Sequence, residues 1–146
     1  MSHADGKLTL EWVSPHVLGD VWPIIRPWVE RVISKAQEPY LAEDVFYEIK
    51  AANARLFLFL TPEKEIVGHV VIQPLGKTLH LWQIFGVAGH SADVVLCLNE
   101  HLDAIAAGEF AKEITFSSPR KGWCKWLETI GFTPKSVVYQ RELKHG

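Results

Sequence analysis

Residues 79–111 read LHLWQIFGVAGHSADVVLCLNEHLDAIAAGEFA, and this stretch decides the fold. The apolar run from Leu79 to Phe85 is typical of a strand, a glycine-containing turn follows, and apolar residues then recur at helical spacing. Such a turn brings the end of a strand to the N-terminus of a helix, where backbone N–H groups face an anionic ligand. We therefore expect this stretch to organise the fold and to hold the functional site.

The preceding chain supplies the rest of the sheet. Strands are expected at residues 8–13, 55–60 and 65–73, with a turn at 61–64 between the last two. The segments 55–60, 65–73 and 79–85 should form an antiparallel meander, with a second turn at 74–77. The run RLFLFL at 55–60 is almost wholly apolar, which indicates a strand covered on both faces. Gly68 marks a bulge or a close backbone approach.

Two helices are expected between the first and second strands, at residues 15–36 and 41–54. In the first, Pro23 is tolerable in an opening turn, but Pro27 should kink the helix or move its regular start later. In the second, Leu41 belongs to the apolar face. Both apolar stripes are best explained as core packing.

Beyond residue 111, Glu113–Ser117 is expected to form a strand parallel to 79–85, because a helix separates the two. A short helix at 123–131 should end with Gly131 at the C′ position. A final strand should contain Val137, Val138, Tyr139 and Leu143. The order β-α-α-β-β-β-α-β-α-β predicts one α/β domain over residues 1–146, with a mixed sheet and helices on both faces.

Composition narrows the classes of function. The 146 residues carry 15 basic and 17 acidic side chains, a net charge of −2, which gives no electrostatic reason to expect a nucleic-acid or membrane partner. The N-terminus lacks an apolar signal segment, and no apolar run approaches the ~20 residues of a membrane span. We expect a cytoplasmic protein that is not secreted, with Cys97 and Cys124 as reduced thiols.

The order of elements resembles that of the GNAT superfamily, the Gcn5-related N-acetyltransferases. The most telling local match is WLETIGF at 126–132, which looks like the family's late helix ending at a Gly-Phe pair before the last strand. The stretch SPRKGW at 118–123 and the long helix before it look more narrowly like small GNAT-like proteins of tailed bacteriophages, some of them tied to virions. The resemblance implies the GNAT fold, with acetyl-CoA or a related acyl-CoA as the cofactor.

In this superfamily a Gln/Arg-x-x-Gly-x-Gly/Ala turn points its N–H groups at the coenzyme pyrophosphate. Gln83–Ala88 matches these letters but begins inside the expected strand. Ala88–Asp93 lies at the helix start, but it has one glycine, no arginine and an aspartate that would repel the pyrophosphate. Ser91 is expected to cap the helix. The cofactor-binding residues that the resemblance implies are Phe85, Gly86, Val87, Ala88, Gly89, His90 and Ser91.

The catalytic residues of the superfamily are only partly present. Its acid is often a tyrosine in the late helix, and the matching position holds Leu127, which cannot transfer a proton. Tyr139 is the nearest replacement by sequence. The strand before the turn lacks the carboxylate that often serves as the base and offers His80 instead. The candidate catalytic residues are therefore His80 and Tyr139. No metal is expected, because the nearby His and Cys residues do not have the spacing of a ligand motif.

Two functions stay open. The first is an acyl-CoA-dependent N-acyltransferase with a degenerate coenzyme and catalytic motif, which acts on a small-molecule or protein amine. The second is a GNAT-fold phage protein without catalysis, a virion, assembly or host-directed component that binds a protein partner or itself. Leu127 and the missing strand carboxylate motivate the second function. Six tryptophans also fit it, since some could lie at an interface.

Overall fold

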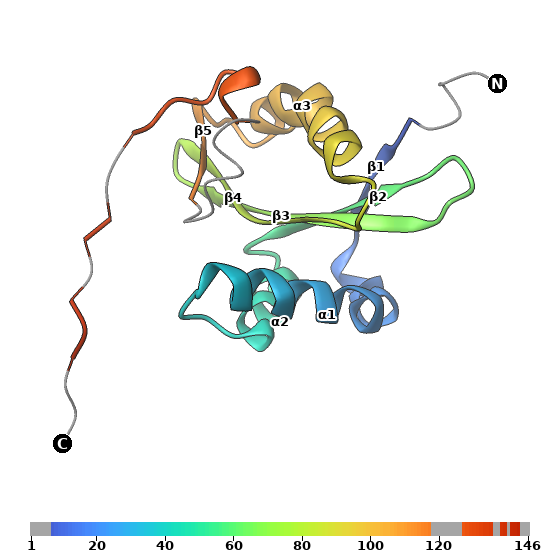
Figure 1. The fold of residues 1–146 in the computed structure, drawn as a ribbon, viewed down its shortest axis with the longest axis horizontal. Coiled ribbons are helices and arrows are strands. Elements are labelled where there is room, and N and C mark those ends of the chain that lie inside the picture. The colour runs from blue at the N-terminus through green and yellow to red at the C-terminus, as the bar shows by residue number, and fades with distance from the viewer. Residues whose placement is uncertain (1–6, 118–126, 136–137, 140, 144–146) are drawn as a thin grey trace.

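The computed structural model describes residues 7–117, 127–135, 138–139 and 141–143. In these residues a five-stranded sheet has the order β1-β2-β3-β4-β5. Helices α1 and α2 cover one face of the sheet and α3 covers the other (Figure 1). The elements are β1 Thr9–Val13, the 3-10 turn η2 Pro15–Val17, α1 Leu18–Ala36, α2 Ala42–Lys50, β2 Arg55–Leu60, β3 Ile66–Leu75, β4 Thr78–Gly86, α3 Ser91–Gly108 and β5 Glu113–Phe116. The expected α/β class, with helices on both faces, is confirmed.

The sheet is mixed in the way the sequence predicts. Strands β1 to β4 pair antiparallel in chain order, and β5 pairs parallel to β4 after the α3 crossover. The bounds of β2 match the prediction. β3 runs further than expected, because Pro74 still pairs with Leu79 and leaves only Gly76 and Lys77 in the turn. Gly76 has a φ of +62°, which suits glycine.

Both expectations for Gly68 are confirmed. The register between β2 and β3 shifts at Phe59 and Leu60, next to Gly68. A Cβ on Gly68 would lie 2.3 Å from the backbone oxygen of Phe85, so β3 and β4 approach too closely there for any side chain.

A second irregularity lies in β4. Val71 pairs with Gln83, but Ile72 pairs with Leu81, so Trp82 is an extra residue in β4. Such a bulge interrupts the alternation of side chains between the two faces. Trp82 packs against the core under α1, and Gln83 donates a hydrogen bond to Val29 of α1. Two consecutive residues therefore face the same side of the sheet.

Pro27 was expected to kink the first helix or to move its regular start later, and the later start is wrong. The helix α1 begins at Leu18 and continues through Pro23 and Pro27 to Ala36. Both prolines are exposed and lie four residues apart on the solvent side. The carbonyls that they leave without an N–H partner, those of Gly19 and Pro23, therefore face water.

The ends of the other helices also differ from the prediction. α2 begins at Ala42, and Leu41, expected on the apolar face, is extended and 63% exposed. Its N–H donates to the Asp44 carboxylate at 2.8 Å, which places Leu41 at the cap. The residue before α3 is His90, which makes no side-chain cap bond, so the expected cap at Ser91 is wrong.

The C-terminal part agrees with the prediction up to the Gly-Phe pair and differs from it after that pair. Gly131 has a φ of +91°, and the N–H of Phe132 donates to the oxygen of Leu127 at 3.0 Å, as in a helix end with a C′ glycine. The expected last strand does not form in its described residues, where Tyr139 is 91% exposed. Lys135 pairs with Glu113 of β5, and in Figure 1 the described residues that follow lie away from the sheet. Val137 and the stretch 118–126 lie outside the described residues.

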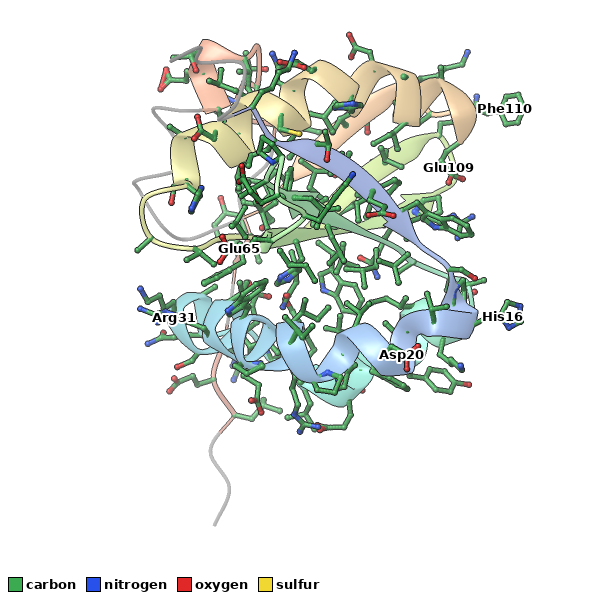
Figure 2. All side chains as sticks on the ribbon, turned by 90° about the vertical axis from the view of Figure 1, so that its right-hand side faces the viewer. His16, Asp20, Arg31, Glu65, Glu109 and Phe110 are labelled. Carbon is green, nitrogen blue, oxygen red and sulfur yellow. The ribbon has the colours of Figure 1, made fainter. Side chains whose placement is uncertain are left out.

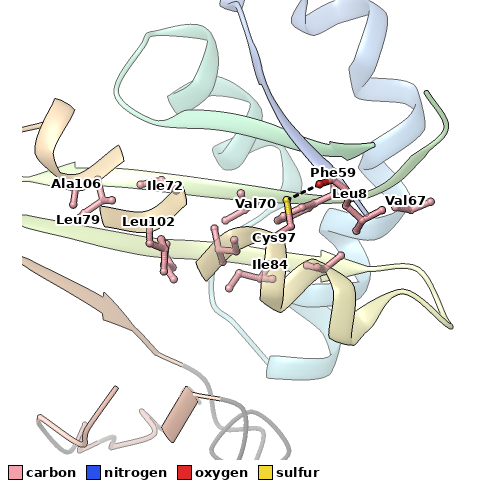
Figure 3. Close-up of a cluster of buried hydrophobic side chains, with 13 residues drawn as sticks. Leu8, Phe59, Val67, Val70, Ile72, Leu79, Ile84, Cys97, Leu102 and Ala106 are labelled. Carbon is pink, nitrogen blue, oxygen red and sulfur yellow. Dashed lines mark hydrogen bonds between the residues drawn. The ribbon is translucent and has the colours of Figure 1, made fainter. Parts of the chain in front are cut away.

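Each face of the sheet has its own core. Under α3 the buried cluster is apolar apart from Cys97, whose Sγ lies 3.5 Å from the oxygen of Leu8 (Figure 3). Burial raises the pKa of the Cys97 thiol to about 11, so it stays protonated. The cluster under α1 and α2 includes Ile25, Val29, Val45, Ile49, Leu56, Leu58 and Val71. Of the helices that the structure describes, none has the length and apolarity needed to cross a bilayer.

Candidate functional site

The sheet opens at the outer side of β4. Strand β5 pairs with β4 only from Thr78 to Leu81 and ends at Phe116, whereas β4 continues to Gly86. Among the described residues, positions 82–86 therefore have no strand beside them on that side. The opening lies immediately before the turn that leads into α3.

Two glycines shape that turn. A Cβ on Gly86 would lie 3.1 Å from Cγ2 of Val94 and 3.3 Å from Cα of Ser91, so the start of α3 packs directly on the end of β4. Gly89 has a φ of +89°, in the region that favours glycine. The turn is closed by a hydrogen bond of 2.9 Å from the N–H of His90 to the oxygen of Val87.

The turn and the first turn of α3 carry unpaired donors. Val94 makes the first helical bond, from its N–H to the oxygen of His90 at 2.9 Å. Within the described part of the chain, no acceptor is paired with the N–H groups of Ala88, Gly89, Ser91, Ala92 and Asp93. These groups lie at the positive end of the helix dipole, where an anion is stabilised. The exposed carboxylate of Asp93 opposes that effect.

Of the seven residues predicted to bind the cofactor, three offer free N–H groups: Ala88, Gly89 and Ser91. The N–H groups of Val87 and His90 are used inside the protein, the former on the oxygen of Val67 at 2.8 Å. Phe85 and Gly86 pair with β3. Gln83, the first residue of the match at Gln83–Ala88, lies within β4 as expected, with its side chain fully buried against α1. Only the placement around 88–93 coincides with the helix start.

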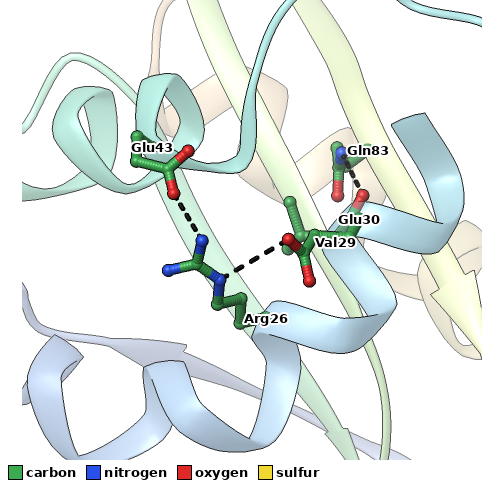
Figure 4. Close-up of polar contacts among 5 residues, drawn as sticks. All are labelled: Arg26, Val29, Glu30, Glu43 and Gln83. Carbon is green, nitrogen blue, oxygen red and sulfur yellow. Dashed lines mark hydrogen bonds and ion pairs between the residues drawn. The ribbon is translucent and has the colours of Figure 1, made fainter. Parts of the chain in front are cut away.

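The side chain of Gln83 belongs to a buried polar network under α1. Its Nε2 donates to the backbone oxygen of Val29 at 3.3 Å (Figure 4) and to the hydroxyl of Tyr40 at 3.1 Å. Its Oε1 lies 2.9 Å from Nε2 of His69 on β3. Arg26 of α1 forms ion pairs with Glu43 of α2 and with Glu30 on the same helix (Figure 4).

These contacts fix the direction of each hydrogen bond. The oxygen of Val29 can only accept, so the atom that faces it must be the amide nitrogen of Gln83. Oε1 then faces His69, and Nε2 of His69 must carry the proton. Burial lowers the pKa of His69 to about 4, against a smaller upward effect of Gln83, so the ring is neutral at pH 7. Its Nδ1 is the one buried side-chain N or O atom without a partner in the described residues.

Aromatic rings surround this network. The Trp28 ring stacks on His69 and Phe85, with centroid distances of 6.3 Å and 5.3 Å. Tyr40 contacts Trp82, with centroids 5.0 Å apart. Trp82, Gln83 and Phe85 all belong to the part of β4 that, among the described residues, has no partner on its outer side. The opening is therefore bounded on the α1 side by rings and by the Gln83 network.

The two candidate catalytic residues lie in different surroundings. His80 is half-buried on β4, two residues before the opening, and its Nδ1 lies 2.8 Å from Oγ1 of Thr115 on β5. Burial lowers the pKa of His80, so the ring is neutral at pH 7. Tyr139 is 91% exposed and is in the C-terminal segment that leaves the sheet (Figure 1). The structure does not bring the two residues together.

Sequence reasoning missed His69 and Tyr40. A histidine within the apolar strand run VGHVVI is a signal of a buried polar group, since such groups need a specific partner. Tyr40 gives no such signal, because it follows Pro39 in a short connection. In the part of the chain that the structure describes, no three His, Cys, Asp or Glu side chains gather as metal ligands would.

Comparisons with known proteins bear on the fold. No family model matches this sequence, and no curated protein matches it. The structure is similar to a ribosomal-protein-alanine N-acetyltransferase from Brucella melitensis biovar Abortus 2308, with a TM-score of 0.69, 12% identity and coverage of 94% of this chain and 99% of that one. It is also similar to a putative acetyl transferase from Pyrococcus furiosus, with a TM-score of 0.65, 17% identity and coverage of 94% and 100%. A third match is an aminoglycoside acetyltransferase from an uncultured soil metagenomic sample, with a TM-score of 0.68, 11% identity and coverage of 94% and 99%.

These similarities extend over nearly the full length of each chain at low identity. They agree with the mixed α/β architecture described above. The chain therefore has the fold of the GNAT acetyltransferases.

Proposed function

We propose that this protein is an acyl-CoA-dependent N-acyltransferase. One observation carries the proposal: the sheet opens at β4 directly beside a helix N-terminus that has free N–H groups. The N–H groups around 88–93 suit the coenzyme pyrophosphate. The opening along residues 82–86 suits the thioester arm, which can extend beside an unpaired strand edge.

The reaction needs few groups from the protein. The nitrogen of an amine attacks the thioester carbonyl carbon, the carbon–sulfur bond breaks, the amine gives up a proton and CoA leaves as a thiolate that takes one. His80 is the candidate to accept the amine proton, since its ring is unprotonated at pH 7. Tyr139 is the sequence-based candidate to protonate the thiolate, and its exposure favours water in that role. Positioning of the amine against the thioester supplies most of the rate.

The acceptor is an amine of a small molecule or a protein. The names of two similar structures, an aminoglycoside acetyltransferase and a ribosomal-protein-alanine N-acetyltransferase, represent these two classes. A release assay for free CoA with acetyl-CoA and two probes, an aminoglycoside and a peptide with N-terminal alanine, would tell them apart.

Asp93 offers a test of the coenzyme site that does not need the acceptor. Its carboxylate in the first turn of α3 opposes the pyrophosphate, so Asp93→Asn should tighten CoA binding about two- to fivefold, as expected for ~0.3–1 kcal/mol at a helix end. Asp103→Asn, an exposed aspartate at the other end of the same helix, is the matched control and should leave the Kd unchanged. Isothermal titration calorimetry measures all three proteins.

The alternative is a GNAT-fold phage protein that binds a partner without catalysis. Leu127 at the position of the family's tyrosine motivates it. A wild-type protein that does not bind CoA at millimolar concentration would rule out the enzyme and leave this alternative. CoA binding that Asp93→Asn tightens and Asp103→Asn does not would support the enzyme.

A further inference from the structure

The hydrogen bonds of the Gln83 network run in one direction, from His69 toward Tyr40. His69 donates from Nε2 to Gln83, and Gln83 donates from Nε2 to the hydroxyl oxygen of Tyr40. Both protons of the Gln83 amide are used, the second on Val29. Tyr40 therefore accepts, and its own O–H proton is left free to donate, with no acceptor among the described residues. The chain of hydrogen bonds ends in a free donor.

That donor lies on the α1 side of the unpaired stretch of β4. Gln83 belongs to the part of β4 without an outer partner, and the Tyr40 hydroxyl is 3.1 Å from its amide. The Tyr40 ring is held against Trp82, the first residue of the same unpaired stretch. Burial raises the pKa of Tyr40, with a smaller upward effect from the negative charge of Glu38, so the hydroxyl keeps its proton at pH 7.

Burial of the network lowers the stability of the folded state. The network places two polar side chains, both fully buried, in a layer of aromatic rings and leaves Nδ1 of His69 without a partner. An apolar pair of similar size would avoid that cost. What the polar pair provides is a fixed orientation of Tyr40, because a polarised chain of hydrogen bonds holds its last member more firmly than a single bond would.

We propose that the Tyr40 hydroxyl donates a hydrogen bond to the carbonyl oxygen of the bound thioester, and that Gln83 and His69 are positioning residues that aim it. This inference rests on the proposed function, since it needs an acyl-CoA in the opening. As the amine attacks, the carbonyl oxygen gains negative charge, and a donor aimed at it stabilises that charge. No proton is transferred in this step, so Tyr40 leaves it unchanged.

The test compares the affinities for acetyl-CoA and for CoA, which differ by the acetyl group. Tyr40→Phe keeps the ring and removes the donor, so the preference for acetyl-CoA over CoA should fall about two- to tenfold, as expected for one neutral hydrogen bond. Tyr47→Phe, an exposed tyrosine on α2, is the matched control and should keep the wild-type ratio. Calorimetric titration gives both Kd values for each variant.

A second variant separates aiming from folding. Gln83→Met keeps the Tyr40 hydroxyl and removes the group that orients it, so the same ratio should fall. A purely structural role of Gln83 would lower the melting temperature and leave the ratio unchanged. Ultraviolet titration of the phenols provides an independent readout: Gln83 lowers the pKa of Tyr40, so Gln83→Met should raise it further.

The outcomes distinguish the two proposals. Wild-type protein that binds acetyl-CoA, with an unchanged ratio in Tyr40→Phe, overturns the role of Tyr40 and leaves the acyltransferase standing. Wild-type protein that binds neither ligand overturns the acyltransferase and the role of Tyr40 with it. A ratio that falls in Tyr40→Phe and in Gln83→Met, but not in Tyr47→Phe, supports both.

Discussion

The face of the sheet under α3 buries apolar side chains and one thiol, whereas the face under α1 also buries His69 and Gln83. Both faces belong to the same strands and differ only in which residues alternate toward them. Burial of apolar side chains stabilises the folded protein, but these side chains cannot form hydrogen bonds or transfer protons. On the face under α1, the cost of removing two polar side chains from water offsets part of that stabilisation. The difference indicates where the chain supports a fold and where it supports a site.

The largest expected effect lies on the α3 face. Phe59 is fully buried there, so Phe59→Ala should lower the free energy of unfolding by about 4 kcal/mol, through lost burial and a cavity. Urea denaturation at pH 7 measures it. Phe110→Ala removes a phenylalanine that is 87% exposed and should change stability by less than about 0.5 kcal/mol. A similar loss in both variants would show that this face is not a packed core.

The next effect depends on pH and lies on the α1 face. The pKa of His69 is about 4 in the folded protein and 6.5 as its ordinary value, so the unfolded chain binds a proton first as the pH falls. Stability from the neutral ring is fully present above pH 6.5 and is lost as the pH falls toward 4. The difference of 2.5 between these two pKa values corresponds to about 3 kcal/mol in the free energy of unfolding.

This pH dependence is measured by urea denaturation at intervals between pH 7 and pH 4. His69→Gln cannot titrate, so its stability should fall less over this window than that of the wild type. His16→Gln, which removes an exposed histidine from η2, serves as the control and should follow the wild type. Equal slopes in the wild type and His69→Gln would mean that the ring is not buried in its neutral form.

The smallest effect is the coupling inside the network. Gln83→Met leaves the Nε2 proton of His69 without an acceptor and should cost about 2 kcal/mol, the penalty of a buried group left unpaired. Adding His69→Phe removes this unpaired N–H group, so the double variant should lose less stability than the sum of the losses in the two single variants. The coupling should be about 1 kcal/mol. His69→Phe combined with Cys97→Ala, on the opposite face, should instead add within about 0.5 kcal/mol.

How much the sequence predicts depends on whether the signal is local. The bounds of β2 and the approach of β3 to β4 at Gly68 follow from an apolar run and a glycine, and both were predictable. The unbroken α1 was not, because the tolerance of Pro27 depends on which side of the helix faces water. The last strand was predicted wrongly, because the apolar character of Val138, Tyr139 and Leu143 does not show whether these residues pack on the sheet.

The candidate site was predictable as a place and only partly as residues. The turn between β4 and α3 was located from its glycines and from the helix that follows. The buried contacts of Gln83 could not be predicted, because motif letters do not reveal the direction of a side chain. The link between Tyr40 and Gln83 spans 43 residues and appears only once α1 and α2 are folded against the sheet.

Trp82 has a consequence for insertions and deletions. It is the extra residue of β4, so the side chains that follow it are turned over relative to those before it. Losing this one residue would remove the bulge but keep the pairs Val71–Gln83 and Ile72–Leu81, so Gln83 and Phe85 would still face α1 and Ile84 would still face α3. The Gln83 network would keep its direction and lose only the ring that packs on Tyr40. Elsewhere in β4, the loss of one paired residue would turn the following side chains to the other face of the sheet. The strand should therefore accept a one-residue deletion at Trp82 better than at a paired position such as Leu81.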